Sequence, residues 1–543
     1  MPSTLANLDG LECDVAVIGA GINGASAARE LSEAGYSVLL CDKEDFAAGA
    51  SSRSSRMLHC GLRYFEAENP VAAFGLHPQR FLQALKMARA GMEARHEIAA
   101  TAADGVKPFT MCFPVYPESP VKSWHLDVGL RLLERIGPGA PPLEYRKITG
   151  DFERHLPFAG DLRDLDRLKA VATYREYVFD WPERFCVDAA LEAEAAGAVV
   201  KNFCRAELVE RDAAKRWILR LEAKDGSIAT AKARLVFNTA GTWIDEVNAE
   251  AGDGSHEGTH DAPREGPERL IRGTKGAHMM VRLPERYQGY GIATMHRQGM
   301  PFYAMPSHED FFYFGPTETP FDGDAKDISA TDDEIDFLLG EANYLLPGLN
   351  LTRADIAFTW AGVRPLTFDE ELPMGRRSRE IHDLSQDGMP NVFAMTAGPV
   401  MSHRSAGRVL RKRAEAALGP APHANGKSAS PWRISETSPR LSQPEPAGNA
   451  RRAAFRHAVT HEHARDLKGI LYTRTALAWR RHLAREDVEE AARSVADLLE
   501  WTPERTAEEV EGFLNYQRTV FRTGLRSNDR STAMPASTGD MQP

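Results

Sequence analysis

The sequence predicts an α/β fold: a discontinuous Rossmann-like nucleotide-binding domain, an antiparallel-sheet substrate domain and a C-terminal all-helical cap domain. Three observations carry this prediction. A strand, a glycine-rich turn, a helix and a second strand follow one another between Asp14 and Asp42. Strand-like runs alternate with loops between Arg272 and Tyr344. Apolar residues recur at helical spacing between Val488 and Leu499.

The glycine-rich turn is the element around which the rest of the chain is organised. An apolar run at 15–18 leads into Gly19-Ala20-Gly21-Ile22-Asn23-Gly24. We expect Gly19 to permit the tight turn, Gly21 to let the backbone approach a pyrophosphate, and Gly24 to let the helix pack close to the strand. Asp42 follows at about the spacing of a ribose-binding acid. Because these parts all occur together, the sequence predicts a bound dinucleotide.

Hydroxyl and basic residues come after the second strand. Ser51-Ser52-Arg53-Ser54-Ser55-Arg56 is followed directly by Met57-Leu58-His59-Cys60-Gly61-Leu62-Arg63-Tyr64. Next to a phosphate-binding turn, such residues can make additional contacts with a bound dinucleotide. The residues that follow them would then lie near its reactive ring. The alternative interpretation is a solvated loop.

These motifs resemble the N-terminal signature of the FAD-dependent, aerobic-type glycerol-3-phosphate dehydrogenases, within the broader D-amino-acid-oxidase-like oxidoreductases. Three more motifs follow in the family's order: Lys275-Gly276-Ala277-His278, Gly315-Pro316-Thr317-Glu318 and Ala361-Gly362-Val363-Arg364-Pro365-Leu366. The resemblance covers most of residues 12–525. It implies FAD as cofactor, oxidation of sn-glycerol 3-phosphate to dihydroxyacetone phosphate, and a quinone-type electron acceptor.

The glycine unit and the resemblance together give a set of predicted cofactor contacts. They include a second glycine turn at Ala240 and Gly241, and Ala206, where the family's chain passes the adenine. They also include the strand end at Gly398, just before the predicted helix that runs through Ser405 to Leu410. The predicted contacts are Gly19, Gly21, Asn23, Gly24, Asp42, Ser51, Ser52, Ser54, Ser55, Arg56, His59, Gly61, Ala206, Ala240, Gly241, Gly398, Pro399 and Ser402.

Domain boundaries follow from changes of pattern along the chain. Residues 12–108, 165–265 and 355–415 are predicted to form the FAD-binding domain, and residues 109–164 and 266–354 the substrate domain. Residues 416–450 are rich in Pro, Ser, Ala and Gly and are predicted to be a linker. Residues 451–526 are predicted to form the helical C-terminal domain, and residues 527–543 a disordered tail.

Arg63 and Arg364 are the predicted anchors for the charged end of the substrate. A guanidinium group offers two parallel donors to a phosphate and keeps its charge when water is excluded. An arginine is usually a surface residue, so residue type alone does not favour an anchor. The match to family motifs at both positions is the reason to predict this role. Tyr64, His403 and Arg404 are further candidates for substrate binding.

His59 and His278 are rival candidates for the catalytic base. An imidazole has a pKa suited to removing a hydroxyl proton while hydride leaves the neighbouring carbon. Either residue could instead be a hydrogen-bonded structural histidine, and the sequence leaves their order open. No motif resembles a metal cluster or a Ser/His/Asp hydrolase, so no metal is expected.

Composition limits the remaining possibilities. The net charge of −11 argues against general nucleic-acid binding. Six scattered cysteines suggest neither a disulfide framework nor a zinc site, which favours a reducing compartment. With neither a signal peptide nor a membrane span in the sequence, we expect a cytoplasmic protein. Peripheral contact with the inner face of the membrane is a weaker expectation, based on arginine clusters at 451–456 and 480–485, and a homodimer is left open.

Two rival functions remain beside the dehydrogenase. One is an oxygen-using oxidase of an amine or a 2-hydroxy acid with the same fold. The other is a flavoprotein that has lost catalysis and serves as a binding or redox-structural component.

The chain departs from the family pattern at Pro399. Family members carry a lysine directly after the glycine that corresponds to Gly398, and that lysine reaches the flavin and the substrate. Proline supplies neither charge nor N–H. The family's His-Gly-Gly is also His59-Cys60-Gly61 here. We therefore expect weakened turnover of glycerol 3-phosphate or a related substrate with less negative charge, with His403 as a partial replacement for the lysine.

Overall fold

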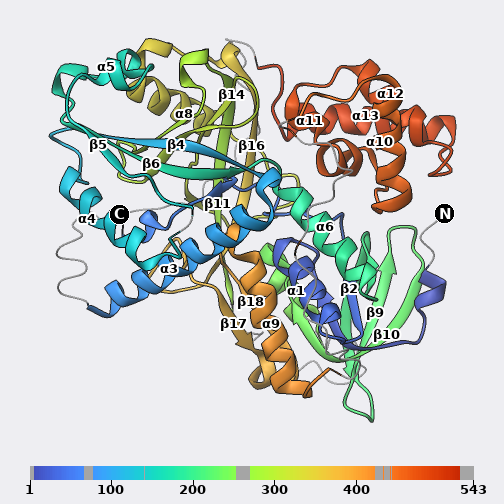
Figure 1. The fold of residues 1–543 in the computed structure, drawn as a ribbon. Helices are drawn as coiled ribbons and strands as arrows, with labels where there is room; N and C mark the ends of the chain where they lie inside the picture. Colours follow the sequence, from blue (N-terminus) through green and yellow to red (C-terminus); the bar gives the residue numbers. More distant parts are fainter. Residues whose placement is uncertain are drawn as a thin grey trace, which may run out of the picture.

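A computed structural model describes residues 5–65, 78–139, 141–251, 269–421, 432, 441 and 443–525. The side chains of Ala6, Arg63 and Arg80 are outside this description. The described chain forms two large sheets and a C-terminal helical domain (Figure 1). The mixed α/β class predicted from the sequence is confirmed.

The first sheet has a parallel centre. Its strands run in the order β17-β18-β10-β1-β2-β7, with all neighbours parallel except β17 and β18. A hairpin of two further strands extends antiparallel from β10. The strands are β1 (Leu11–Ile18), β2 (Val38–Cys41), β7 (Val199–Lys201), β8 (Cys204–Arg211), β9 (Trp217–Ala223), β10 (Ile228–Asn238), β17 (Glu380–Asp383) and β18 (Val392–Thr396).

Three helices cover one face of this sheet. α1 (Ile22–Glu33) packs against both α6 (Pro182–Ala195) and α9 (His403–Leu418). Their apolar residues join those of β1, β2, β10 and β18 in one core. On the opposite face, α7 (Ile244–Glu250) packs near β8. This is the layered arrangement expected for a nucleotide-binding domain, in which ligands bind at the carboxyl ends of the parallel strands.

The second sheet is mostly antiparallel. Its order is β15-β11-β14-β13-β12-β4-β6-β3, with β16 paired to β11, β5 paired to β6, and a parallel pair between β12 and β4. Its strands are β3 (Met57–Leu58), β4 (Val106–Val115), β5 (Arg146–Ile148), β6 (Ala170–Phe179), β11 (Ile271–Arg282), β12 (Tyr290–Met295), β13 (Pro301–Pro306), β14 (Phe311–Gly315), β15 (Thr319–Pro320) and β16 (Ile356–Thr367).

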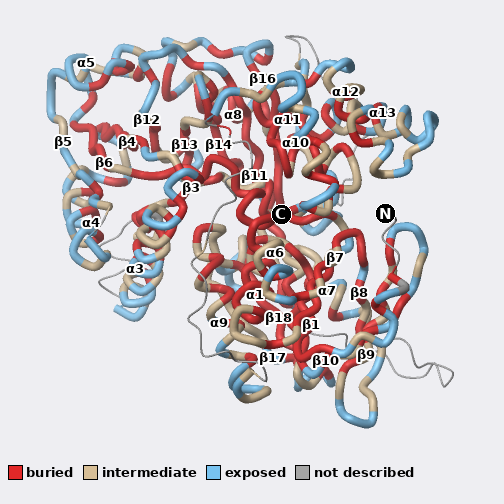
Figure 2. The backbone as a smooth tube through the Cα atoms, turned by 45° about the vertical axis from the view of Figure 1, so that its right-hand side comes forward, coloured by how far each residue is buried: buried red, intermediate tan, exposed pale blue. Residues whose placement is uncertain are grey.

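Helices cover this sheet on both sides. α8 (Asp332–Leu345) packs against one face in one apolar core, while α3 (Pro78–Thr101) and α4 (Ser123–Ile136) contribute to the core on the other. Figure 2 shows buried residues running along β11 and β18 through the middle of the molecule. The two sheets are thus joined by continuous buried structure, and the site described below lies in this region.

Three strands correct the predicted domain ranges. β3, β6 and β16 all lie in the second sheet, although residues 12–108, 165–265 and 355–415 were predicted for the FAD-binding domain. β6 and β16 are buried along most of their length. An apolar strand buried on both faces carries no local signal of which sheet it joins, because only its pairing with β4 or β11 distinguishes the two.

The C-terminal domain is helical, as predicted. It contains α10 (Gly448–His461), the π-helical turn η12 (Gly469–Arg474), α11 (Leu477–Arg480), α12 (Arg485–Val495) and α13 (Pro503–Thr519). Figure 1 shows it, in orange and red, beside the second sheet. Its Trp479 meets Trp360 of β16 edge to face, with ring centroids 5.7 Å apart. Most of the predicted linker, and the predicted tail at 527–543, lie outside the described residues.

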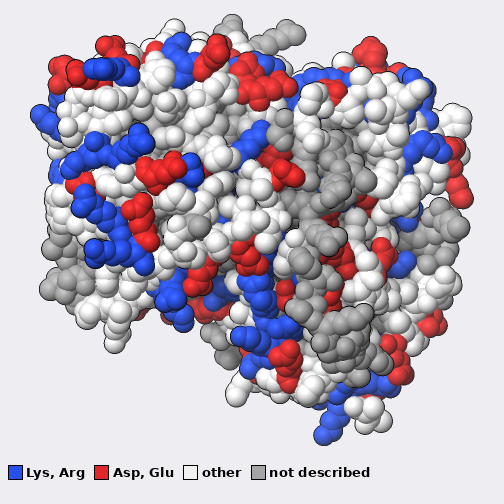
Figure 3. Space-filling model, in the orientation of Figure 1, with Lys and Arg blue, Asp and Glu red and all other residues white. Residues whose placement is uncertain are grey.

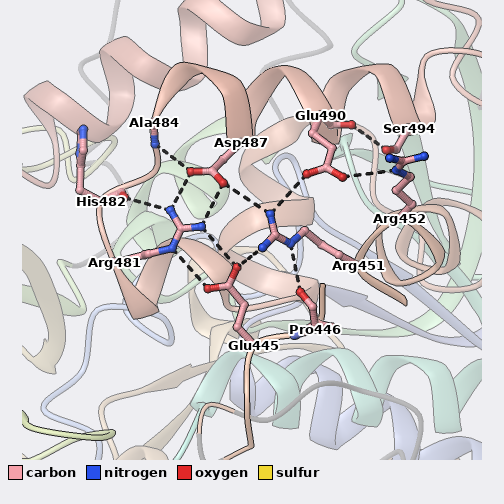
Figure 4. A network of polar contacts seen from close by, with 10 residues as sticks. All are labelled: Glu445, Pro446, Arg451, Arg452, Arg481, His482, Ala484, Asp487, Glu490 and Ser494. Atoms are coloured by element: carbon pink, nitrogen blue, oxygen red, sulfur yellow. Dashed lines mark hydrogen bonds and ion pairs between the residues drawn. The ribbon is translucent and has the colours of Figure 1, made fainter. Parts of the chain in front are cut away.

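Arginines on the C-terminal helices are paired with carboxylates. Arg451 contacts Glu445, Asp487 and Glu490, and Arg481 contacts Glu445 and Asp487 (Figure 4). Arg452, Arg456 and Arg485 also have acidic partners. Basic and acidic side chains are likewise interspersed over the face drawn in Figure 3. In the described part of the chain, each helix is too short or too polar to cross a bilayer.

Candidate active site

A cavity of about 150 Å³ lies beside the N-terminus of α1. It is bordered by the turns that follow β1, β10 and β18, so it lies at the carboxyl ends of the parallel strands. Predicted cofactor contacts that line it are Gly19, Gly21, Asn23, Asp42, Ser51, Ala206, Ala240, Gly241 and Gly398. These residues come from six separate stretches of the chain, at 19–23, 42, 51, 206, 240–241 and 398.

The structure gives a physical reason for two glycines of the turn. Gly19 has a φ of +99°, and a Cβ there would lie 2.7 Å from the carbonyl oxygen of Thr239. A Cβ on Gly24 would lie 1.9 Å from the carbonyl oxygen of Gly19. Gly24 does not line the cavity but allows α1 to pack against the turn. Gly21 occupies the N-cap of α1, and Ser51 Oγ accepts the Ile22 N–H at 3.0 Å.

Asp42 at the end of β2 supports the turn. Its carboxylate accepts the Ala20 N–H at 2.6 Å and the Glu44 N–H at 2.9 Å. Burial raises the pKa of Asp42 to about 7, and the two backbone N–H donors oppose this by favouring the ionised form. A ribose hydroxyl at this position would add a further donor to the same carboxylate.

A second cavity of about 180 Å³ adjoins the first. The two share the lining residues Ala50, Pro365, Ala397, Gly398 and Val400. The second cavity brings together residues from both sheets and from the Ser/Arg loop. Predicted site residues that line it are Ser54, Ser55, Arg56, His59, Tyr64, His278, Arg364, Gly398 and Pro399.

His278 on β11 is fixed in the wall of the second cavity. Its ring stacks on Trp360 with centroids 4.8 Å apart, and its Nε2 lies 2.9 Å from Ser55 Oγ. It is 1% exposed, and Nδ1 has no hydrogen-bond partner among the described residues. Burial, assisted by the charges of Arg364 and Arg56, lowers the pKa of His278 well below its usual value. The imidazole is therefore neutral at neutral pH.

Arg364 on β16 pairs with Thr274 of β11, the strand that carries His278. Its guanidinium is packed over Gly276, where a Cβ would lie 2.4 Å from Nη2. Its Nη1 is 3.8 Å from Glu318 Oε1. The same carboxylate oxygen contacts Arg377, another residue of the cavity wall. Gly276 therefore makes room for a guanidinium that is held beside a buried carboxylate.

His59 and Tyr64 also line the second cavity. Their rings meet edge to face with centroids 5.5 Å apart. Arg63 lies between them in the short helix η2 (Leu62–Phe65), but its side chain is outside the described residues. Both histidines predicted as base candidates are thus brought to one cavity, together with one of the two predicted arginine anchors.

Besides Gly24, three predicted cofactor contacts line neither of the two cavities, and Arg56 lines the second cavity but is also held by residues outside it. Ser52 lines a neighbouring cavity and donates to the Gly49 carbonyl, while Gly61 packs against Ala88 of α3. Ser402 donates to the Pro399 carbonyl at 2.8 Å and closes the turn before α9. Arg56 lines the cavity but stacks its guanidinium over Trp479 at 3.9 Å, with Glu183 at 3.4 Å.

His403 and Arg404 do not line the cavity, contrary to their predicted role in substrate binding. His403 is fully buried with Nδ1 2.9 Å from the Val400 carbonyl, and burial lowers its pKa to about 3. Arg404 is buried and contacts Thr101 and Glu97 of α3. A helix start does not reveal from sequence which residues point inward. A neutral, buried His403 is unable to replace the charge of a lysine at position 399.

Sequence reasoning missed Arg377 and gave Glu318 only as part of a motif. Arg377 lies in the connection between β16 and β17, next to Arg376, whose backbone is bridged to Thr367 by hydrogen bonds of 2.8 and 3.0 Å. The only local signal was a pair of arginines after a glycine. The bridge to Thr367 depends on tertiary pairing, so the sequence did not indicate which arginine would reach the cavity.

A family model described as "FAD dependent oxidoreductase" matches residues 14–413. The chain belongs to this family. The match confirms the broader family expected from the sequence motifs and identifies FAD as the cofactor of this oxidoreductase.

Two curated relatives are glycerol-3-phosphate dehydrogenases. The one from Synechocystis is 29% identical over 409 residues, which cover 73% of this chain and 69% of the relative. The aerobic one from Staphylococcus epidermidis is 28% identical over 401 residues, which cover 73% of this chain and 66% of the relative. The match thus spans about two thirds of the length of these relatives.

Solved structures show the same fold. The glycerol-3-phosphate dehydrogenase from Bacillus halodurans complexed with FAD has a TM-score of 0.68 at 18% identity, covering 97% of this chain and 98% of that one. The L-α-glycerophosphate oxidase from Mycoplasma pneumoniae with FAD bound has a TM-score of 0.52 at 16% identity, covering 78% of this chain and 99% of that one. At these identities the likeness concerns the fold alone.

The residues present in this family member fit FAD. A dinucleotide needs close backbone approach at its pyrophosphate, and the space over Gly19 and Gly21 at the α1 N-terminus provides it. The linings of the two adjoining cavities together extend from Asp42 and Ala206 to Pro399 and Arg364. Their chemistry differs, because only the second is lined by histidines and by a cluster of arginines, whereas the first is lined by Arg205.

Proposed function

We propose that this family member oxidises sn-glycerol 3-phosphate, or a close relative, to dihydroxyacetone phosphate and passes the electrons to a quinone-type acceptor. The observation that carries the proposal is the second cavity, where neutral His278 and the guanidinium of Arg364 lie in one wall beside the turn at Gly398. Similarity to two glycerol-3-phosphate dehydrogenases supports the substrate class.

His278 is the proposed base. FAD, when bound, supplies a hydride acceptor for the carbon that bears the hydroxyl group. The neutral imidazole accepts the hydroxyl proton, and Ser55 and Trp360 hold the ring in one orientation. The low pKa keeps the base unprotonated at neutral pH. His59 remains the alternative, because it lines the same cavity, and matched variants of both residues decide between them.

Arg364 is the proposed anchor for the phosphate. Its charge persists in a site shielded from water, and two parallel N–H donors suit phosphate oxygens. Anchoring the phosphate at one end of a three-carbon substrate fixes the distance of the central carbon from the anchor, which turns binding energy into orientation. Arg63 is proposed to assist from the neighbouring helix η2.

The quinone-type acceptor is proposed from the family resemblance of the sequence motifs. Peripheral membrane contact would bring such an acceptor within reach, but the arginine clusters first considered for it are each engaged with carboxylates. We therefore expect little binding to anionic vesicles through these clusters. Co-sedimentation at low salt tests this, and binding that is lost in Arg452→Gln would contradict it.

Turnover assays with two readouts test the proposed function. Purified holoenzyme with an artificial electron-accepting dye should convert glycerol 3-phosphate to dihydroxyacetone phosphate. The rival, an oxygen-using oxidase, would release hydrogen peroxide in air without the dye. Stoichiometric peroxide with an amine or a 2-hydroxy acid, and no turnover of polyol phosphates, would favour that rival.

A further inference from the structure

Arg377 faces the same cavity as Arg364 but comes from a different element. It follows Gly375, which has a φ of +74°, in the connection between β16 and β17. The backbone of its neighbour Arg376 is bridged to Thr367 at the end of β16. This bridge turns the chain back over the sheet and brings Arg377, but not Arg376, into the cavity wall.

Glu318 joins the two arginines. Its Oε1 contacts an Nη atom of Arg377 and lies 3.8 Å from Nη1 of Arg364. The Glu318 side chain is 3% exposed, whereas those of Arg364 and Arg377 are 22% and 32% exposed. The carboxylate is therefore underneath, and the two guanidinium groups lie between it and the open space.

This arrangement has a consequence for charge. Two guanidinium groups close together repel each other, and a carboxylate between them lowers that cost while it fixes their positions. With two positive groups and one negative group, the cluster keeps a net positive charge at the cavity wall. A guanidinium has five N–H donors, which suits it to several oxygens of one anion.

We infer that Arg364 and Arg377, bridged by Glu318, form a two-arginine clamp for the phosphate group of the substrate, and that Arg377 is a specificity-determining residue. This inference rests on the proposed function for the identity of the substrate. Its ligand is a tetrahedral oxyanion that bears negative charge, and a neutral polyol gains nothing from a positive clamp. Pro399, in the same wall, contributes no charge, so the clamp carries the anion contact on this side.

The clamp predicts a change in affinity rather than in chemistry. Arg377 is placed to hold the anionic group and not the reacting carbon, so Arg377→Gln should raise KM for glycerol 3-phosphate with little change in kcat. Charge-assisted contacts of this kind correspond to roughly tenfold in affinity.

Binding of inorganic phosphate to the FAD-loaded enzyme, measured by calorimetry, tests the clamp without turnover. We expect Arg377→Gln to weaken phosphate binding about tenfold. The matched control is Arg376→Gln, because Arg376 is adjacent and equally charged but is paired with Asp369 at 2.5 Å and Glu380 at 3.4 Å outside the cavity. The control should bind phosphate as the wild type does. Phosphate binding by Arg377→Gln that matches the control would overturn the inference.

A second measurement uses the wild-type protein, in case Arg377→Gln folds poorly. Phenylglyoxal modifies accessible guanidinium groups, and mass spectrometry reports each arginine separately. Phosphate should slow the modification of Arg377 severalfold and leave that of Arg376 unchanged. Equal modification of Arg377 with and without phosphate would overturn the clamp. Because neither readout needs catalysis, protection of Arg377 without turnover of any polyol phosphate would refute the proposed function and leave the clamp intact.

Discussion

His278 shows how the surroundings of one residue fix its chemical state. Its ring lies between Trp360 and Ser55 and is shielded from solvent, and two guanidinium charges disfavour protonation. A histidine with its ordinary pKa would be partly protonated near neutral pH, and the protonated fraction cannot accept a proton. Because His278 is buried, it does not change its protonation state near neutral pH.

Replacing His278 should slow the chemical step. We expect His278→Asn to retain FAD and to reduce its anaerobic rate of flavin reduction by about a hundredfold or more, because a positioned base contributes that much. Stopped-flow absorbance measures this rate, with His59→Asn as the matched variant. A slow His59→Asn beside a normal His278→Asn would transfer the role to His59.

The pH dependence of the same rate follows from the direction of the shift. His278 accepts a proton only when it is neutral, and its pKa lies well below its usual value. The wild-type rate should therefore stay constant through the ordinary histidine range and fall only at more acidic pH. A fall in the rate of flavin reduction near the ordinary pKa of histidine, present in the wild type and absent in His278→Asn, would contradict this.

Arg364 and Gly276 should act together. Arg364→Ala removes a charge-assisted contact worth about 1.5 to 3 kcal/mol, so apparent affinity for the anionic substrate should fall roughly ten- to a hundredfold with flavin intact. Gly276→Ala should weaken affinity in the same direction, because its Cβ would displace the guanidinium end of a flexible side chain. Gly512→Ala, where the new Cβ meets no atom within 4 Å, is the control. Unchanged saturation in Arg364→Ala would refute the anchor.

At the scale of elements, two turns build the site: the turn between β1 and α1, and the turn between β18 and α9. The first was predictable because every part of it is local: an apolar run, three spaced glycines, a helix and Asp42. For the second turn, the sequence predicted where the turn lies but not where the side chains that follow it point. The buried ring of His403 and the contacts of Arg404 with α3 depend on packing between elements distant in sequence.

The same limit explains the other differences between sequence and structure. The membership of β6 and β16 in the second sheet follows from register with β4 and β11, which local apolar runs do not encode. Arg377 enters the cavity through the bridge between Arg376 and Thr367. His59, His278, Tyr64 and Arg364 were predictable because each lies in a motif with fixed neighbours.

Replacing Pro399 tests whether the turn between β18 and α9 limits turnover because it lacks a cation. Pro399 lies in extended backbone with φ −71° and lines the cavity without supplying a charge. If the missing cation limits turnover, Pro399→Lys should raise kcat/KM for glycerol 3-phosphate severalfold, because the lysine would add a charge contact to the anion. Ordinary efficiency in the wild type, with no gain in Pro399→Lys, would make the departure neutral.

At the scale of the whole molecule, buried ion pairs attach the C-terminal domain to the nucleotide-binding domain. Arg474 contacts Asp45 with Nη2 2.8 Å from Oδ1, and Arg184 of α6 contacts Glu462 at 2.8 Å. Asn202 adds a hydrogen bond from Nδ2 to the His463 carbonyl of the C-terminal domain at 2.8 Å. The domain also presents Trp479 to Arg56 of the Ser/Arg loop. Its docking therefore supports one wall of the second cavity from behind.

Breaking one of these pairs should loosen the assembly. Arg474→Met leaves Asp45 buried without its cation, which typically costs about 3 to 5 kcal/mol. We expect a lower unfolding temperature and faster proteolysis within the C-terminal domain. The control Arg505→Met removes a 49% exposed arginine that pairs with Glu508 and Glu509 of its own helix, and should change stability by less than about 1 kcal/mol. Equal effects of the two variants would show that the buried pair does not attach the domain.

The most direct test of the proposed function is anaerobic mixing of the purified flavoprotein with a panel of substrates. Glycerol 3-phosphate should bleach the visible absorbance of the bound flavin and yield dihydroxyacetone phosphate in equal amount, while glycerol should not. If dithionite reduces the flavin but no polyol phosphate does, or if only an amine or a 2-hydroxy acid bleaches it, the proposed function is wrong.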